Sequence, residues 1–305
     1  MKLSKYEVFI KVVELGSMSK AADYCMYTQS AISQIISSIE SELNIVLLNR
    51  NHAGVSLTTE GMQIFPFIKD IGLSYSKLSD KTFSLLGVES GMIRIGSYSS
   101  ISCHLLSPII NAFCEQHPNI QFEILQGDYR KNENWISDGT VDIGFVALPT
   151  RSEFDIIPFI SDMMLALLPK DHHMAKYNRI PLSIFAEEPF VYLHQGTQKE
   201  VIEAFKANNI IPRIEYRTED DYVAMSMVES GLGISILAEL VLYRTPYNIE
   251  IKETDPPLRR NLAIAKNSKK KTSLIVQRFL DFLQEYPYTD IIDNILASRL
   301  NIANK

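Results

Sequence analysis

Apolar and polar positions near the amino terminus of the chain alternate with the period of an α-helix. Apolar positions recur at i, i+4, i+7 and i+11, which predicts one buried stripe: Ile32, Ile36, Ile39 and Leu43. The opposite face carries short polar side chains: Gln29, Ser30, Ser33, Gln34 and Ser37. A helix buried on one side, with amides and hydroxyls on the other, suits insertion into the major groove of DNA. An ordinary helical hairpin with a polar outer face fits this stretch alone equally well.

Hydroxyl side chains mark where the amino-terminal helices are predicted to begin. Ser19 and Thr28 each stand before a helical segment, where a hydroxyl can accept an otherwise unpaired backbone N–H. Ser4 and Glu7 have the spacing of a capping box, and Gly16 is expected to end that first helix. Its inner face is predicted to hold four apolar side chains: Tyr6, Phe9, Ile10 and Val13. These segments together predict a small three-helix core.

The helical spacing of apolar residues continues from Thr59 to Gly87 and predicts one long helix there. Its seam positions fall alternately four and three residues apart, close to a heptad repeat: Ile64, Ile68, Ile71, Tyr75, Leu78, Thr82 and Leu85. Roughly thirty helical residues would span about 45 Å, which is too long for a domain of sixty residues to cover. We therefore predict that this helix, which Pro66 can kink, pairs with a second copy of itself. The alternative is a long helix packed on the remainder of its own chain.

Beyond Gly91 the pattern changes to strands that alternate with helices. Strands are predicted at 92–97, 120–125, 141–146, 164–169, 190–193, 214–218, 234–236 and 262–265. Helices are predicted at 105–117, around Trp135, and at 200–208, 223–230 and 273–285. This alternation predicts an α/β fold with a mostly parallel sheet, in which a second α/β unit begins near Asp162 and residues 262–265 return the chain to the first.

The motifs of the first sixty residues resemble those of a known family. Leu47 to Arg50 and Ala53 to Gly61 have the pattern of a β-ribbon, or wing, that leads into a new helix. Ala21-Ala22 and the run from Thr28 to Ser33 precede them, and Leu57-Thr58-Thr59-Glu60-Gly61 closes the series. In this order and spacing the motifs resemble the winged helix-turn-helix of LysR-type transcriptional regulators.

The resemblance extends over nearly the whole chain and implies a domain organisation. It implies a winged helix-turn-helix at 1–60, a linker and dimerisation helix at 61–88, and an effector-binding domain at 89–305. The effector domain would have the two-lobed α/β form of periplasmic binding proteins, with lobe I at 91–161 plus 266–305 and lobe II at 162–265. The expected partners are double-stranded DNA, a small-molecule effector and further copies of the chain, as a homodimer or homotetramer.

Candidate DNA contacts fall into two groups. Base-reading candidates lie on the polar face of the second helix, where a Gln can make a bidentate contact to adenine: Gln29, Ser30, Ser33, Gln34 and Ser37. Phosphate-binding candidates flank that face: Ser19, Lys20, Thr28 and Arg50. Where the family often places Arg on this helix, the sequence has Gln34 and Ser37.

Candidate effector contacts follow from the rule that ligands sit at the carboxyl ends of strands in such sheets. Ser99 and Ser100 stand at the end of the first predicted strand, where they can bind a polar ligand or simply cap a helix. Strand-end positions and the family resemblance together give the full set of candidates: Ser99, Ser100, Ile101, Gln126, Ala147, Gln195, Thr197 and Glu219. Hydroxyls and amides fit acids, amino acids and sugars alike, so the effector stays open.

Composition and charge change this picture in one respect. The 305 residues are 46% hydrophobic and 22% charged, which permits a packed core in two or three domains. The net charge is −6, and in the first sixty residues five basic residues face six acidic ones. Because phosphate neutralisation supplies most non-specific affinity for DNA, useful binding is predicted to require two or more copies together. No apolar run is long enough for a signal peptide or a membrane span, so we expect the cytoplasm.

The sequence offers little that favours an enzyme. It holds no recognised catalytic or nucleotide-binding motif, and we predict no catalytic residue, metal or cofactor. The cysteines, Cys25, Cys103 and Cys114, are read as buried thiols. His172 and His173 are adjacent, so their side chains would point apart on a helix or strand, and a surface turn is predicted in preference to a metal site. The alternative function is a solute-binding or enzymatic α/β domain fused to a DNA-binding head. The tail at 286–305, with a possible helix at 289–300, has no assigned role.

Overall fold

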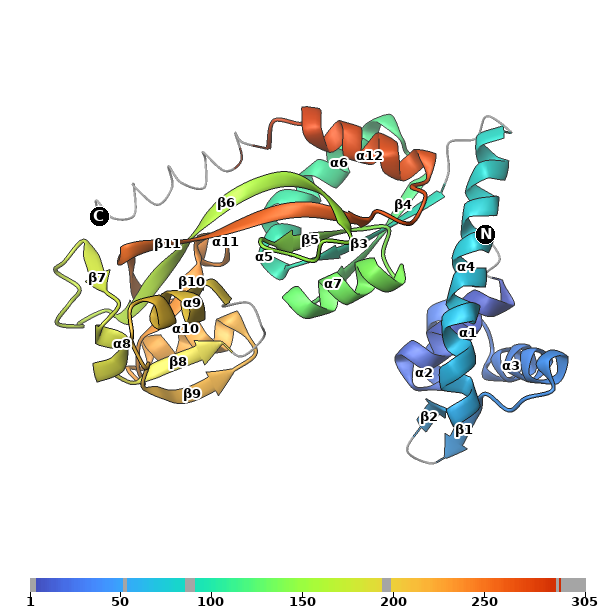
Figure 1. Ribbon diagram of the computed structural model, residues 1–305, viewed down its shortest axis with the longest axis horizontal. Coiled ribbons are helices and arrows are strands. Elements are labelled where there is room, and N and C mark those ends of the chain that lie inside the picture. The colour runs from blue at the N-terminus through green and yellow to red at the C-terminus, as the bar shows by residue number, and fades with distance from the viewer. Residues whose placement is uncertain (1–3, 52–53, 86–90, 194–198, 289–290, 292–305) are drawn as a thin grey trace. The chain divides into compact units, whose positions relative to one another are not determined.

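A computed structural model describes residues 4–51, 54–85, 91–193, 199–288 and 291. The chain divides into two compact units, Met1–Gly91 and Met92–Lys305 (Figure 1). In the described ranges, no helix combines the length and apolar character needed to cross a bilayer.

The first unit is a helical head with a two-stranded wing. Its helices are α1 (Lys5–Leu15), α2 (Met18–Cys25), α3 (Gln29–Leu43) and α4 (Thr59–Leu85). The wing consists of β1 (Leu48–Asn51) and β2 (Gly54–Leu57), which pair antiparallel. The predicted order of helices, ribbon and long helix is therefore confirmed, although Gly87 lies outside the described residues.

Capping explains where the three short helices begin. Ser4 and Glu7 form the predicted capping box, and the Thr28 hydroxyl accepts the backbone N–H of Ala31 at 3.2 Å, as predicted. The prediction for Ser19 is wrong: Ser17 caps α2 by accepting the N–H of Lys20. Helix α2 begins two residues earlier than expected, because Ser17 is extended and Met18 already belongs to the helix.

The core of the head follows the predicted stripe with one exception. Ile32, Ile36 and Ile39 are buried, whereas Leu43 is exposed because it is the last residue of α3. In α1 the fully buried side chains are Val8, Phe9 and Val12; the other predicted inner residues, Tyr6, Ile10 and Val13, pack at its edge. The buried face of α1 is thus rotated by about one position from the predicted one.

The second unit is built on a seven-stranded sheet in the order β10-β6-β11-β5-β3-β4, with β7 beside β11. These strands are β3 (Gly91–Ser97), β4 (Ile120–Gln126), β5 (Ile143–Ala147), β6 (Phe154–Pro169), β7 (Arg179–Pro181), β10 (Ser235–Ala238) and β11 (Ile249–Asn267). A separate parallel pair consists of β8 (Phe190–Leu193) and β9 (Ile214–Thr218).

The prediction of a mostly parallel sheet is wrong. β3 and β5 are parallel, but β6 pairs antiparallel with β11 and β10, and β11 pairs antiparallel with β5. The physical reason is the length of β6 and β11, which run past each other in opposite directions for most of their 16 and 19 residues. Only residues 164–169 and 262–265 of these strands were predicted, because Pro158, Pro256 and Pro257 interrupt the strand pattern.

The two long strands connect two lobes, each with its own apolar core (Figure 1). Phe159 and Leu262 belong to one core, whereas Met164 and Leu258, farther along the same strands, belong to the other. The first core also holds Phe113, Phe145 and Phe279 among others, and Leu262–Ala265 pairs with β5 there, as predicted. Because β6 and β11 both cross between the lobes, polar side chains on these strands lie at the junction between the two apolar cores.

Helices cover both lobes. In the first lobe they are α5 (Ser99–Ile101), a π-helical turn (Ser102–Leu106), α6 (Ser107–Gln116), α7 (Tyr129–Asp138) and α12 (Leu274–Glu285). In the second they are α8 (Ile184–Glu187), α9 (Lys199–Ala207) and α10 (Asp221–Glu229), with α11 (Glu239–Leu242) following β10. The possible helix at 289–300 falls almost entirely outside the described residues.

Candidate functional site

The polar face of α3 is open along most of its length. Gln29, Ser30, Gln34 and Ser37 are exposed, and Ser33 is half-buried. These amides and hydroxyls can reach the edges of bases, because no charged side chain of α3 stands among them in its first two turns. Ser19, Lys20 and Thr28 are exposed on the elements before this face.

Arg50 is tied to α3 by an ion pair. Its Nη2 lies 3.0 Å from Oε2 of Glu40, and its Nη1 donates to the hydroxyl of Ser33 at 3.4 Å. The other oxygen of Glu40 accepts the backbone N–H groups of Leu47 and Leu48 at 2.9 and 3.1 Å. Glu40 therefore holds both the start of the wing and the guanidinium of Arg50 in place. Arg50 stays partly exposed, at 39% of its side chain, so it can also meet a phosphate.

Gly61 explains why the wing runs directly into α4. The backbone carbonyl of Leu47 accepts the N–H of Thr58 at 2.9 Å, and a Cβ on Gly61 would overlap that same oxygen. The Thr58 hydroxyl accepts the N–H of Gly61 at 2.9 Å and donates to the carbonyl of Val46. The Leu-Thr-x-x-Gly motif thus joins the wing to the first turn of the long helix through close backbone contact.

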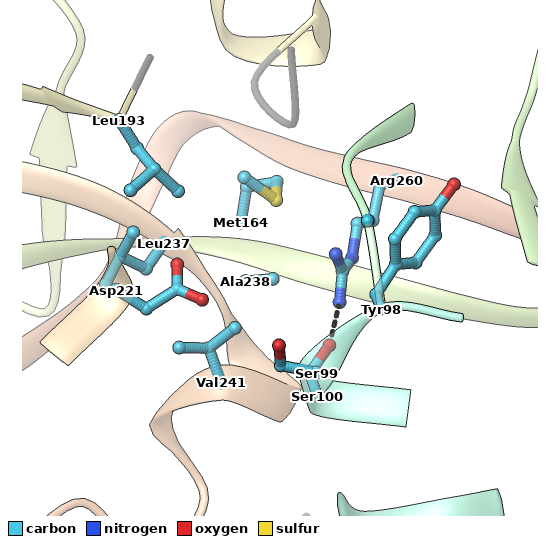
Figure 2. Close-up of a pocket in the computed structure, with 11 residues that line it drawn as sticks. Tyr98, Ser99, Ser100, Met164, Leu193, Asp221, Leu237, Ala238, Val241 and Arg260 are labelled. Atoms are coloured by element: carbon cyan, nitrogen blue, oxygen red, sulfur yellow. Dashed lines mark hydrogen bonds between the residues drawn. The ribbon is translucent and has the colours of Figure 1, made fainter. Parts of the chain in front are cut away.

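A pocket lies at the junction of the two lobes of the second unit (Figure 2). Its cavity volume is about 50 Å³, which is smaller than the roughly 300–1,000 Å³ of typical small-molecule sites, and the pocket continues into open solvent. Polar side chains come from both lobes and from β11, and apolar ones complete the wall: Tyr98, Ser99, Ser100, Gly127, Met164, Leu193, Asp221, Leu237, Ala238, Val241 and Arg260.

Arg260 is the buried cation of this pocket. Its Nε and Nη2 both donate to Oδ2 of Asp162, at 2.9 and 2.6 Å, and Nη2 also donates to the hydroxyl of Ser100 at 3.2 Å. Arg260 and Asp162 are only 3% and 5% exposed. Burial opposes the charge of the guanidinium, but the carboxylate of Asp162 outweighs it and holds the pKa of Arg260 above its ordinary value.

Asp221 brings a second carboxylate to the pocket, at the first position of α10. Figure 2 shows its carboxylate turned toward the space between Arg260 and Ser99. Burial raises the pKa of Asp221 to about 6, and the charge of Asp220 adds to that rise while Arg260 opposes it.

Within the described part of the chain, buried oxygens of three further side chains near Arg260 meet no hydrogen-bond partner of normal geometry: the hydroxyls of Tyr98 and Tyr129 and the carboxylate of Glu200. The Tyr129 hydroxyl nevertheless interacts with the guanidinium of Arg260. Burial raises the pKa of Tyr129 to about 12 and also raises the pKa of Glu200 above its ordinary value. Buried polar atoms without partners are rare in folded proteins, and a site that awaits a polar ligand is one place where they occur.

The effector candidates from the sequence divide into three groups. Ser99 and Ser100 line the pocket. Ile101 and Ala147 are buried in the first core, and Gln126 and Glu219 are exposed outside the pocket lining, one residue from Gly127 and two from Asp221 respectively. Gln195 and Thr197 lie outside the described residues.

Sequence reasoning did not find Arg260, Asp162 or Asp221. Asp162 and Arg260 are 98 residues apart and become neighbours only because β6 and β11 are antiparallel, with the two residues directly opposite each other. Asp221 could have been recognised from the sequence. Glu219 was chosen as a candidate because it follows a predicted strand, and Asp221 lies two residues further along the chain.

His172, His173 and Glu188 form a separate cluster in the second lobe. The two histidines lie in a surface turn, as predicted, and their ring centroids are 4.5 Å apart. Glu188 reaches Nε2 of His172 at 2.6 Å, and the three groups could hold a metal ion. However, Nδ1 of His172 accepts the N–H of Met174, so Nε2 carries the proton of a neutral ring and donates it to Glu188. A metal-bound histidine instead donates from its second nitrogen, so this geometry favours a hydrogen-bonded pair.

The cysteines show one departure from the prediction of buried thiols. Cys25 is buried and Cys114 half-buried, but Cys103 is exposed. All three are free thiols. Cys103 belongs to the π-helical turn and Cys114 to α6.

Comparison with known proteins identifies the family. The model of the LysR substrate binding domain matches residues 86–287, and that of the bacterial regulatory helix-turn-helix protein of the lysR family matches residues 3–62. The chain belongs to the LysR family of transcriptional regulators. Its members bind DNA through the amino-terminal head and carry an effector-binding domain behind it, so the predicted fold class and function are confirmed.

Similar proteins share this organisation over their full length. An uncharacterized HTH-type transcriptional regulator from Bacillus subtilis, YvbU, is 28% identical over 93% of this chain and 98% of its own. The transcriptional dual regulator GltC from the same organism is 25% identical over 94% and 97%. The crystal structure of CbnR, a LysR family regulator, has a TM-score of 0.66 at 18% identity over 93% of this chain and 99% of its own.

Proposed function

We propose that the pocket around Arg260 binds the effector of this regulator. The observation that carries the proposal is the junction itself: Ser100 on the first lobe, Asp221 on the second and Arg260 on a connecting strand face one cavity. A ligand that contacts both lobes stabilises one arrangement of them over others, because it binds that arrangement more tightly. Such a change alters the placement of subunits and the spacing of their recognition helices on DNA.

We further propose the roles of individual residues in the head. Gln29, Ser30, Ser33, Gln34 and Ser37 read base edges, and Ser19, Lys20, Thr28 and Arg50 hold phosphates. The exposed polar face of α3 supports the first assignment, and the partly exposed guanidinium of Arg50 supports the second. The CbnR structure in complex with its target DNA, with a TM-score of 0.64 to this chain, supports the use of the head on DNA.

We infer that the protein works as a dimer or larger assembly through α4. Three positions of the heptad seam, Ile71, Tyr75 and Leu78, are exposed at 44%, 45% and 63%, whereas Ile68 is buried in the core of the head. An apolar stripe of this kind gains free energy when a second copy covers it. We assign the linker helix to 61–88, between the head at 1–60 and the effector domain at 89–305. The predicted lobe boundaries, lobe I at 91–161 plus 266–305 and lobe II at 162–265, need one change, because Leu262–Ala265 pack in the core of lobe I.

A metabolite screen on the full-length protein tests the proposal. Compounds that raise the melting temperature are compared on the protein and on its Ser99→Phe variant, which places a ring in the pocket from an exposed position. A true effector stabilises only the parent protein and changes its affinity for a duplex from upstream of its own gene. Effector control with an unchanged response in Ser99→Phe would place the site elsewhere, and turnover of a stabilising compound would favour an enzyme.

A further inference from the structure

The charges at the pocket differ in whether they already have partners. The Nε and Nη2 groups of Arg260 already donate their hydrogen bonds within the protein. Two of these bonds go to the buried carboxylate of Asp162 and one to the hydroxyl of Ser100. Its positive charge is therefore largely neutralised by a carboxylate of the protein. An anionic ligand would have to share this guanidinium with Asp162 at close range, which like-charge repulsion disfavours.

Asp221 is in the opposite situation. Its neighbour Asp220 caps α10 by accepting the N–H groups of Tyr222 and Val223, at 2.8 and 3.0 Å. The side chain of Asp221 makes no hydrogen bond or ion pair within the described part of the chain, although it is mostly shielded from solvent. A shielded carboxylate without a partner is an unfavourable feature of an empty site, and a cation removes it.

Acidic groups outnumber basic ones around this cavity. Besides Asp162 and Asp221, Glu200 lies close enough to affect Arg260, Tyr98 and Tyr129 electrostatically, and its oxygens are buried without partners. Among the described groups around the pocket, these three carboxylates face Arg260, which Asp162 already pairs, and Lys199, whose charge acts on Glu200. The field at the cavity favours a positively charged ligand.

The remaining wall indicates what accompanies the charge. Met164, Leu193, Leu237, Ala238 and Val241 line the side that Asp221 shares, so the carboxylate stands at the edge of an apolar surface (Figure 2). A ligand that fits this wall has an aliphatic part next to its charged group, because the aliphatic part then gains the free energy of burial.

We propose that the effector of this regulator is a positively charged amine with an aliphatic stem, and that Asp221 is its counter-ion. The inference rests on the proposed function of the pocket and deepens it. The ammonium group donates to the Asp221 carboxylate, the stem lies along the apolar wall, and the hydroxyl of Ser99 is placed to contact any further polar group. Arg260 and Asp162 fix the floor of the site rather than bind the charge.

The experiment uses matched fragments that differ in charge. Butylammonium, butyrate and 1-butanol are titrated into the full-length protein, with the melting temperature and isothermal calorimetry as readouts. Butylammonium is expected to bind most tightly, and Asp221→Asn is expected to weaken it roughly tenfold or more. Asp220→Asn is the matched control: it removes the adjacent charge but keeps a capping side chain, so butylammonium binding should stay close to that of the parent protein.

The outcomes separate this inference from the proposed function. Tighter binding of butyrate than of butylammonium overturns the inference, and if Ser99→Phe abolishes that butyrate binding, the pocket itself still stands as the effector site. Equal loss in Asp220→Asn and Asp221→Asn, or no binding of butylammonium at all, also overturns the inference. Circular dichroism of each variant should match that of the parent protein, which excludes misfolding. Lowering the pH to about 5 should weaken butylammonium binding to the parent protein roughly tenfold, because Asp221 then takes up a proton. The charged neighbours of Asp221 in this experiment are Arg260 and Asp220.

Discussion

Arg260 and Asp162 stand opposite each other on β11 and β6, and two donors of the guanidinium reach one carboxylate oxygen. The pair therefore joins the two strands that connect the lobes, at the point where the pocket begins. We predict that Asp162→Asn lowers the free energy of unfolding by about 3–5 kcal/mol, because a buried guanidinium is left without its counter-ion. Urea denaturation measures this.

A double variant provides the control for this pair. Asp162→Leu combined with Arg260→Met removes both charges, and its loss of stability should be clearly smaller than that of Asp162→Asn. If the double variant is the less stable of the two, the pair contributes through packing and not through charge.

Asp221 makes stability depend on pH in an unusual direction. Its pKa is about 6 in the folded protein against 3.8 ordinarily. Between roughly pH 4 and 6 the folded state thus holds a proton that the unfolded state has released, and the free energy of unfolding falls as the pH rises. At about pH 7.5, Asp221→Asn should raise stability by roughly 2 kcal/mol and flatten this slope. Denaturant melts across this pH range measure both effects, and Asp220→Asn should reduce the slope only slightly, because burial is the main cause of the raised pKa of Asp221.

Two substitutions in the head separate positioning from base reading. Arg50→Ala should weaken binding to all duplexes alike and reduce the salt slope by about 1, because one phosphate contact is lost. Gln29→Ala should relax preference at one base pair by about 1–3 kcal/mol. Binding titrations at several salt concentrations, on an operator and its single-base variants, measure both. If both variants bind operator like the parent, the assigned roles are wrong.

The close approach of Gly61 to Leu47 predicts a strong effect of one methyl group. Gly61→Ala places a Cβ on the backbone oxygen of Leu47, which cannot yield without moving the wing, so a loss of about 1–3 kcal/mol is expected. Gly72→Ala is the control, because its Cβ meets the Cδ1 end of Ile10 at 2.9 Å, and a flexible side chain can move. Thermal melts compare the two, and equal losses would contradict this account.

The exposed seam of α4 predicts the oligomeric state. Ile71→Asp combined with Leu78→Asp should shift the protein toward monomer, because two apolar contacts become charged in each copy. Operator affinity should fall with it, since one copy of the head carries little positive charge. Sedimentation velocity measures the state. Glu60→Asp with Met62→Asp, near the start of the helix and outside the seam, serves as the comparison, and an unchanged dimer in the Ile71 and Leu78 variant would place the interface elsewhere.

The sequence by itself determined the elements of the head and the polar face of α3. Ile32, Ile36 and Ile39 repeat at helical spacing, and Thr28 caps the helix they define, because capping and amphipathic patterns are local properties of the chain. The same local logic found Ser99 and Ser100 at the end of β3. Its errors were local too: Ser17 and not Ser19 caps α2, and Leu43 falls on the exposed end of α3.

Tertiary structure alone decided the chemistry of the pocket. Asp162 meets Arg260 because β6 and β11 pair antiparallel, and that pairing is set by packing across many residues with prolines in both strands. Asp221 is an ordinary helix-start carboxylate in the sequence and becomes an unpaired, shielded charge only when the second lobe folds around it. Sequence patterns report on neighbours along the chain, whereas desolvation and ion pairing depend on neighbours in space.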